Sequence, residues 1–327
     1  MEALFRDQAG DVLDPISSDL ERVEKIMVDT AAVTGGIGDV FTEFTTHLAR
    51  AGGKRIRPAL TLLASQLGEG PNQNVDYTAA AAELTHLATL YHDDVIDEAT
   101  TRRGVTSANQ MWGNKVAILA GDYLFAKASS LAANVGGIVP EVLATAIAKV
   151  VAGQLTELQS IYDPNRSEEH YFATIDGKTV SLMETCTLFG ASLGECPSSV
   201  VDAMQMFGRN LGFAFQIADD LLDLAASPEA LGKAPGTDLR DGVYTLPLIY
   251  AVAADAAIAD LLAAPEVDVD AVLSATVAAG SFAKAMSRAQ MYLDEALQAL
   301  RTVPDCAARS TLEKLAYSVV ARVPELS

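Results

Sequence analysis

Two clusters of aspartates in apolar, alanine-rich surroundings are the feature that most limits the folds and functions open to this chain. They are Asp93-Asp94-Val95-Ile96-Asp97 and, far downstream, Asp219-Asp220-Leu221-Leu222-Asp223. Helical residues four apart share a face, so each cluster would point its first and last carboxylates the same way. Like charges held close together among apolar residues need a cation. Oxygen ligands suit Mg²⁺, which proteins usually share with substrate phosphates. The pattern therefore predicts two helices that bind Mg²⁺ and phosphate groups together.

A solvated acidic helix face is the alternative for either cluster taken alone. Two copies weaken that alternative, because leucine and isoleucine flank both of them. The middle aspartates, Asp94 and Asp220, lie about 100° around a helix from the leading ones and are the less secure ligands.

The composition favours an all-α fold. Half of the 327 residues are hydrophobic but only 6% are aromatic, which suits closely packed helices better than sheets. Helical patterns run almost throughout, no segment is a firm strand, and no linker divides two kinds of composition. We therefore predict one domain over residues 1–327, a bundle of antiparallel helices. The helix expected at about 18–32 is a candidate for a subunit interface.

The charge and the cysteines narrow the class of protein. A net charge of −20 argues against nucleic acid or an anionic lipid surface as the main partner. The three cysteines have no metal-binding spacing and are expected to be reduced. No uncharged apolar run reaches the length of a membrane span, and the acidic start is not typical of a signal peptide. We expect a cytoplasmic protein without stable membrane insertion.

Cations gather near the expected helix ends, where they suit an anionic group. Lys54, Arg55 and Arg57-Pro58 follow a glycine pair, and Arg102-Arg103 follow the first aspartate cluster. His86 lies two turns before Asp93, on nearly the same helix face. Further along, Lys178-Thr179 stand at an expected helix break, and Gln216 lies three residues before Asp219. Each of these is weak alone, since a basic turn or a structural histidine is the ordinary alternative.

The order of these motifs resembles the trans-isoprenyl diphosphate synthases, the polyprenyl synthetase family. The resemblance covers about residues 50–250, in the order G-K-R-x-R-P, H-x₆-D-D-x-x-D, R-R-G, K-T and F-Q-x-x-D-D-x-x-D. It implies an all-α bundle around a deep central cavity, usually a homodimer. The implied activity is a prenyltransferase, which adds isopentenyl diphosphate head-to-tail to an allylic diphosphate.

The resemblance also assigns roles to the site residues. Mg²⁺, about three ions per site with substrate bound, would be held by Asp93, Asp97 and Asp219 and supported by Asp223. Asp94 and Asp220 would complete the catalytic set with Arg102 and Lys178. The residues implied for the allylic diphosphate are Arg102, Lys178, Thr179 and Gln216, and those for isopentenyl diphosphate are Lys54, Arg55, His86 and Arg103.

One departure from the family pattern follows the second aspartate cluster. The family usually has G-K-x-T-L-P there, whereas this chain has Gly242-Val243-Tyr244-Thr245-Leu246-Pro247, without the lysine that reaches the allylic diphosphate. Lys233 and Arg240 lie in the same polar stretch, and we expect one of them to compensate, with Lys233 the candidate allylic-site residue.

Small residues on the helix before Asp93 bear on product length. Ala81, Thr85, Ala88 and Thr89 form a stripe beside the expected catalytic face. In the family a bulky aromatic four or five positions before the first aspartate gives short products, and this chain has Ala88 and Thr89 there. We expect a product longer than geranylgeranyl, as suits a quinone side chain. Tight helix packing is the alternative, and Leu124, Phe125 or Leu131 could still close a channel.

Three other functions stay open from the sequence alone. A geranylgeranyl or farnesyl diphosphate synthase would differ only in cavity depth. A non-catalytic subunit of a heteromeric synthase would tolerate loss of the aspartates, yet both clusters are intact. A terpene cyclase would normally lack the second cluster and the isopentenyl site.

Overall fold

Helices form almost the whole of the protein, as the alanine-rich composition predicts. The structure is a computed structural model that describes residues 12–33, 38–225, 236–264 and 267–323. Its α-helices include α2 (Ser17–Ala31), α3 (Gly38–Arg50), α4 (Ile56–Ser65), α5 (Gln73–Ile96), α6 (Ala108–Trp112), α7 (Asn114–Val135), α8 (Val139–Leu158), α9 (Glu168–Ile175), α10 (Ser181–Leu193), α11 (Ser198–Ala225), α13 (Thr237–Arg240), α14 (Leu246–Ala254), α15 (Ala257–Leu262), α16 (Val269–Ala278), α17 (Ser281–Leu300) and α18 (Ala307–Ala321).

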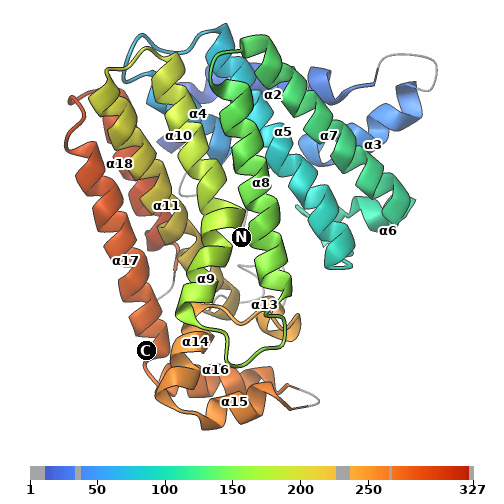
Figure 1. Ribbon diagram of the computed structural model, residues 1–327, viewed down its shortest axis with the longest axis vertical. Helices are drawn as coiled ribbons and strands as arrows, with labels where there is room; N and C mark the ends of the chain where they lie inside the picture. The colour runs from blue at the N-terminus through green and yellow to red at the C-terminus, as the bar shows by residue number, and fades with distance from the viewer. Residues whose placement is uncertain (1–11, 34–37, 226–235, 265–266, 324–327) are drawn as a thin grey trace.

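The long helices stand side by side as a bundle (Figure 1). Helix α5 packs against α2, α4, α7 and α10, while α11 packs against α10, α17 and α18. The two helices that carry the aspartates are therefore central, and both are largely buried along their length. The short helices α13 to α16 gather at one end of the bundle. The predicted all-α bundle is confirmed.

Two apolar clusters stabilise this arrangement. The main one draws on helices from α2 to α18 and holds the bundle together. A smaller one lies under α13 to α16, where Leu239, Tyr244 and Leu248 pack with Ile258 and Val272. Its Tyr244 hydroxyl donates to the Leu262 carbonyl at 3.1 Å. The prediction of a single domain for the whole chain remains a prediction.

A short hairpin is the one strand pair among the described residues, and the sequence patterns did not indicate it. Strand β1 (Thr101–Arg102) pairs antiparallel with β2 (Val105–Thr106). The turn residues Arg103 and Gly104 have φ of 53° and 77°. Two successive left-handed residues are what a two-residue hairpin turn needs, and glycine adopts the second at no steric cost. The hairpin begins just beyond the end of α5, so it brings two arginines back toward the first aspartate cluster.

A break predicted near Gly177 is a π-helical turn, Asp176–Val180, between α9 and α10. A Cβ at Gly177 would meet the Lys149 carbonyl oxygen at 2.6 Å, and one at Gly153 would meet the Lys178 nitrogen at 2.5 Å. Glycine at both positions lets the turn lie directly on α8. This close approach fixes the backbone position from which the Lys178 side chain extends.

Helices α7 and α8 leave part of their apolar surface exposed. Ile118 and Leu119 on α7 and Val151 and Leu155 on α8 are 42–57% exposed. Judged by length and composition, both helices could cross a membrane, and the bent pair α16 and α17 would be a third span if counted as one. By contrast, Val23, Met27 and Ala31 of α2 are fully buried within the chain, and Leu20, Ile26 and Val28 are partly buried.

Candidate active site

The first aspartate cluster lies at the end of α5. Asp93 is half-buried in the last turn, and Asp97 is the exposed residue that caps the helix, its N–H donating to the Asp93 carbonyl at 2.8 Å. Asp94 points elsewhere: it is fully buried, and it accepts a hydrogen bond from Arg102 Nε at 2.6 Å. Asp93 and Asp97 are thus left to face the site, as the helical spacing predicts.

The second cluster, on α11, is more deeply buried, because Asp223 is buried as well as Asp220. The middle residue, Asp220, is 4% exposed and accepts hydrogen bonds from the Tyr171 hydroxyl at 2.5 Å and from Gln216 Nε2 at 2.8 Å. Asp219 is half-buried, with one carboxylate oxygen 3.4 Å from Arg322 Nη1. Asp223 accepts a hydrogen bond from the Asp238 amide at 3.1 Å. In both clusters the middle carboxylate is held inside the protein.

Lys178 interacts with Glu157 and with the first aspartate cluster. Its ammonium donates to Glu157 Oε1 at 2.5 Å, from the π-helical turn to the last turn of α8. Burial opposes its charge, but Glu157 and Asp93 outweigh burial and raise the pKa of Lys178. Lys178 also acts on Asp97, so one ammonium faces both outward-facing carboxylates of the first cluster.

The outward-facing carboxylates suit a divalent cation. Burial, with a contribution from Asp97, raises the pKa of Asp93 to about 6 although Lys178 opposes this shift, and burial also raises the pKa of Asp97. Such groups gain from a cation that restores their charge. Among the described residues no three His, Cys, Asp or Glu side chains are close enough to hold a metal ion by themselves. Asp93, Asp97 and Asp219 therefore form no single protein cage, and Mg²⁺ here would need oxygens from a substrate as well, which is its ordinary behaviour in phosphate sites.

A cationic pocket lies behind the first cluster, around His86. Burial lowers the pKa of His86 well below its usual value, and Arg57, Arg103 and Arg102 lower it further. Several guanidinium groups surround a neutral imidazole, and the buried Glu83, 3.6 Å from Arg103 Nη2, offsets part of their charge. Arg103 is fixed there by its bond to the Gly52 carbonyl at 2.5 Å, and a Cβ on Gly53 would meet its guanidinium at 2.9 Å. This pocket can hold an anion.

The prediction for Arg55 is not supported by its contacts. Arg55 is 7% exposed and turns inward, donating to Glu24 at 2.8 Å and to Glu83 at 3.0 Å. Its third nitrogen donates to the Ala49 carbonyl at 2.7 Å. Because Arg55 adopts a left-handed φ of 48° just before α4, the neighbouring cations separate. Arg55 is occupied as a structural ion pair.

Arg57, which the predicted set for isopentenyl diphosphate leaves out, acts on His86 more strongly than Arg55 does. Its Nε is buried and has no hydrogen-bond partner within the described structure. Burial lowers the pKa of Arg57, while Glu83 opposes that shift. A buried guanidinium nitrogen without an acceptor, beside His86, indicates an anion at this point. The signal available in the sequence was the basic segment itself, which does not say which of its cations faces inward.

Two further residues of α8 were also missed. Glu157 holds Lys178, and Gln154, one turn earlier, has a buried side-chain oxygen without a hydrogen-bond partner in the described part of the chain. The run Gly153-Gln154-Leu155-Thr156-Glu157 was the available signal, but a polar pair on an apolar helix is common on solvated faces.

The remaining predicted residues are placed as follows. Thr179 donates to Gln216 Oε1 at 2.6 Å, so these two lie together beside Asp220. Lys54 Nζ stands 5.8 Å from the centre of the Phe215 ring, next to the second cluster. Arg240 is exposed at the end of α13, and Lys233 lies outside the described residues. The compensation for Val243 expected from one of these two stays a prediction.

The stripe of small residues on α5 is closely packed. Ala81, Thr85 and Ala88 are completely buried, while Thr89 is half-buried and donates to the His86 carbonyl at 2.7 Å. Leu124 of α7, one of the expected floor residues, is completely buried as well. Thr89 alone in this stripe keeps partial exposure beside Asp93.

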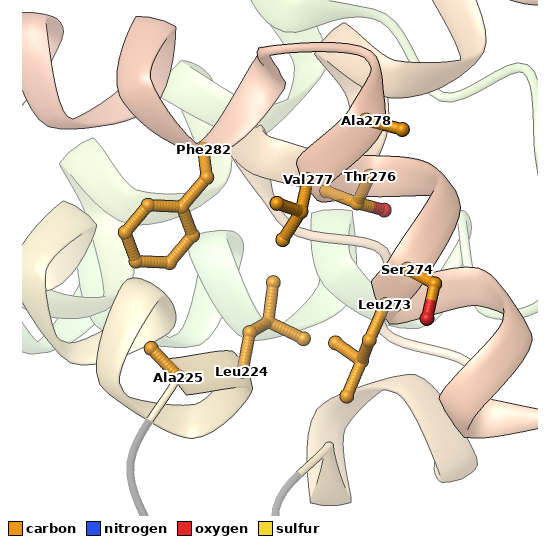
Figure 2. A pocket seen from close by; sticks show the side chains of 8 residues that line it. All are labelled: Leu224, Ala225, Leu273, Ser274, Thr276, Val277, Ala278 and Phe282. Atoms are coloured by element: carbon orange, nitrogen blue, oxygen red, sulfur yellow. The ribbon is translucent and has the colours of Figure 1, made fainter. Parts of the chain in front are cut away.

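A separate cavity of about 470 Å³ opens beyond the end of α11 (Figure 2). It is lined by side chains of α11, α16 and the first turn of α17: Leu224, Ala225, Leu273, Ser274, Thr276, Val277, Ala278 and Phe282. None of these side chains carries a charge, so this cavity does not suit a diphosphate.

Comparisons with known proteins identify the family. The family model described as polyprenyl synthetase matches residues 39–278. The chain belongs to the polyprenyl synthetase family. It is 38% identical to the nonaprenyl diphosphate synthase of Mycobacterium tuberculosis, over 94% of this chain and 93% of that one.

Solved structures of the family superpose closely on this chain. A decaprenyl diphosphate synthase from Rhodobacter capsulatus gives a TM-score of 0.90 at 35% identity, covering 97% of this chain and 99% of that one. A geranylgeranyl pyrophosphate synthase from Corynebacterium glutamicum, complexed with calcium and isoprenyl diphosphate, gives 0.83 at 37% identity, covering 96% and 98%. Enzymes of this family with different product names thus share this fold.

The buried carboxyls predict a pH-dependent stability of the metal-free protein. Burial raises the pKa of Asp220 to about 7 against its two hydrogen bonds, and that of Asp93 to about 6. Both exceed the values in an unfolded chain, so the stability they contribute is complete below about pH 4 and is lost as the pH rises through 6 to 7. We expect the melting temperature in EDTA to fall between pH 5 and pH 8. Over this range the free energy of unfolding should fall by on the order of a few kcal/mol.

The matched variant Asp220→Asn removes one titrating group and keeps the shape. Its melting temperature should fall less steeply over the same range, which separates this carboxyl from the general repulsion of an acidic chain. Parallel curves for the two proteins would contradict the assignment to Asp220.

Proposed function

We propose that this protein is a Mg²⁺-dependent trans-prenyltransferase that adds isopentenyl diphosphate head-to-tail to an allylic diphosphate. The observation that carries the proposal is the presence of two binding regions with different chemistry. One is a set of outward-facing carboxylates opposite Lys178, and the other is the cationic pocket at His86. The first suits a diphosphate bound through metal ions, and the second suits a diphosphate bound directly.

The allylic diphosphate is bound between the two aspartate clusters. Asp93, Asp97 and Asp219 hold Mg²⁺, and Asp223 supports that site. Bound Mg²⁺ supplies positive charge that neutralises the diphosphate as a leaving group. Arg102 and Lys178 face the same oxygens, and Thr179 with Gln216 completes the polar wall. Their fixed charges stabilise the departing diphosphate and hence the allylic cation that it leaves behind.

Isopentenyl diphosphate is bound in the cationic pocket. Lys54, Arg57 and Arg103 provide its positive charges, and neutral His86 donates one ring N–H to a diphosphate oxygen. The double bond of isopentenyl diphosphate then attacks C1 of the allylic cation. The released diphosphate accepts the final proton, so none of these side chains is needed as a general base.

The product is longer than geranylgeranyl in this proposal. The relatives named for nonaprenyl and octaprenyl products support it, with the octaprenyl diphosphate synthase of Escherichia coli 36% identical over 84% of this chain. The absence of an aromatic at Ala88 and Thr89 supports it too. A geranylgeranyl or farnesyl product is the alternative, since the Corynebacterium glutamicum structure carries the geranylgeranyl name at similar identity.

Elongation by the purified protein tests the activity directly. With Mg²⁺, labelled isopentenyl diphosphate and farnesyl diphosphate, we expect products of more than four isoprene units, and no product in EDTA. Asp93→Asn and Asp219→Asn should each lower kcat by at least about a hundredfold, because each removes a charge from the metal site. No elongation from any allylic primer would refute the proposal, and a stop at geranylgeranyl would refute only the length.

Thr89→Phe tests where the growing chain lies. Thr89 is half-buried beside Asp93, so an aromatic there should block the channel, shorten the product and leave the fold intact. Ala88→Phe is a second variant at a fully buried position. Overpacking there should cost roughly 1–3 kcal/mol of stability. Product length by thin-layer chromatography and melting temperature are measured together. A stable Thr89→Phe with unchanged products would move the channel away from this stripe.

The homodimer is part of the same proposal, with α7 and α8 rather than the N-terminal helix as its interface. The exposed Ile118, Leu119, Val151 and Leu155 support this choice, whereas the apolar face of α2 is used inside the chain. A second copy can bury such a surface without inserting α7 or α8 into a membrane, in keeping with the expected cytoplasmic setting.

Leu155→Glu should therefore yield a monomer. A charge at the centre of an apolar interface loses its solvation without a partner, which costs several kcal/mol. Light scattering coupled to gel filtration measures the mass. The control is Tyr317→Glu on α18, where a single apolar residue is 56% exposed outside this surface. An unchanged mass for Leu155→Glu, or a monomeric wild type, would exclude this interface.

A further inference from the structure

Arg166 is a buried cation that neither the sequence motifs nor the proposed mechanism uses. It precedes α9 and is 6% exposed. Its Nη1 donates to the Tyr244 carbonyl at 3.0 Å and its Nη2 to the Thr174 hydroxyl at 2.9 Å. Its Nε is buried without a hydrogen-bond partner, and no carboxylate of the described chain forms an ion pair with it. Burying an arginine without a direct counter-ion costs free energy of folding. A role in stability alone therefore does not account for Arg166.

The acids that Arg166 does face belong to the active site. Glu157, Tyr171 and Asp220 are the groups that favour its charge against burial. Its guanidinium lies 5.7 Å from the centre of the Tyr171 ring, and Tyr171 donates to Asp220. Glu157 in turn holds Lys178. Arg166 is therefore near enough to act on Glu157, and it reaches Asp220 through Tyr171.

Arg166 also holds the segment that follows the second aspartate cluster. The Gly236 amide donates to the Asp223 carbonyl at 2.7 Å, and the Val243 amide donates to the Asp238 carbonyl at 2.8 Å. Tyr244, whose carbonyl accepts from Arg166, is the next residue. The segment also brings Asp241 close enough to act on Asp97. One arginine thus fixes this segment against α9, beside the cluster that it follows.

We propose that Arg166 is a positioning residue for the allylic diphosphate, whose charge offsets Glu157 and Asp220 and whose hydrogen bonds fix the segment carrying Val243. The inference rests on the proposed function and extends it. It assigns to a buried arginine the positive charge that Val243 does not provide at the adjacent position. Arg166 acts through Tyr171, Asp220 and the Tyr244 backbone, and it does not touch substrate in this assignment.

Kinetics of Arg166→Met test the assignment, since methionine keeps much of the length and removes the charge. We expect the KM for farnesyl diphosphate and the Ki for inorganic diphosphate to rise about tenfold, with the KM for isopentenyl diphosphate changed less than about threefold. Val243→Lys added to Arg166→Met should restore most of the loss, because it returns a cation to the neighbouring residue. In the wild-type background the same lysine should gain much less.

The control is Arg309→Met on α18, which also loses a hydrogen bond to a backbone carbonyl, that of Val303, and an ion pair, with Glu313. It should lower the melting temperature without changing either KM. An equal rise in both KM values without rescue by Val243→Lys would reduce Arg166 to a structural role, and unchanged kinetics in a folded Arg166→Met would refute the proposal.

Two further arms keep the test decisive. If Arg166→Met does not fold, Tyr171→Phe removes one oxygen from the same chain of contacts and should raise the KM for farnesyl diphosphate alone. An unchanged KM in that variant would also overturn the assignment. Failure of the wild type to elongate any primer would refute the proposed function itself. That result comes from the wild type alone, so it is distinct from any result with the Arg166 variants.

Discussion

Carboxylates gathered in a poorly hydrated place are the constraint on which this active site depends. Each of them must be neutralised, paired or exposed, since repulsion and burial both act against its charge. The protein uses all three solutions. The middle aspartates, Asp94 and Asp220, are paired inside, with Arg102 and with Tyr171 and Gln216. Asp93 and Asp97, on either side of Asp94, are accessible, and the charge of Lys178 acts on both of them. The same chemical pattern, D-D-x-x-D, thus has a buried middle aspartate in each copy, while its last aspartate is exposed in the first copy and buried in the second.

The α8 helix joins the site to the rest of the fold. Gly153 allows the π-helical turn to approach, Glu157 receives Lys178 from that turn, and Leu155 between them is exposed on the other side. Residues two apart on a helix lie on nearly opposite faces. One turn of α8 therefore carries an apolar outer surface and Glu157, the acid that holds Lys178. Any change in how the outer face is covered acts on the same turn that sets the position of Lys178.

Periodic and repeated signals in the sequence were sufficient for the fold and for the aspartates. The 3.6-residue period and the alanine content predict helices almost throughout, and the structure has them from α2 to α18. Helical spacing also predicts that Asp94 and Asp220 lie about 100° around the helix from the leading aspartates, because that follows from 100° per residue alone. Signals of this kind are local, and local geometry in a helix is almost independent of what packs around it.

Contacts outside regular helices were beyond such reasoning. Whether Arg55 or Arg57 faces the cationic pocket depends on one left-handed residue at the start of α4, and nothing in the order of three cations fixes that conformation. Arg166 could not be predicted for a related reason. It belongs to no motif, and its partners Tyr244, Tyr171 and Glu157 come from other elements of the fold. Small residues before Asp93 were equally ambiguous, since a channel wall and a tight helix contact require the same alanines. The buried Ala81 and Ala88 show the contact, so a growing chain that passes them must first separate α5 from its neighbours.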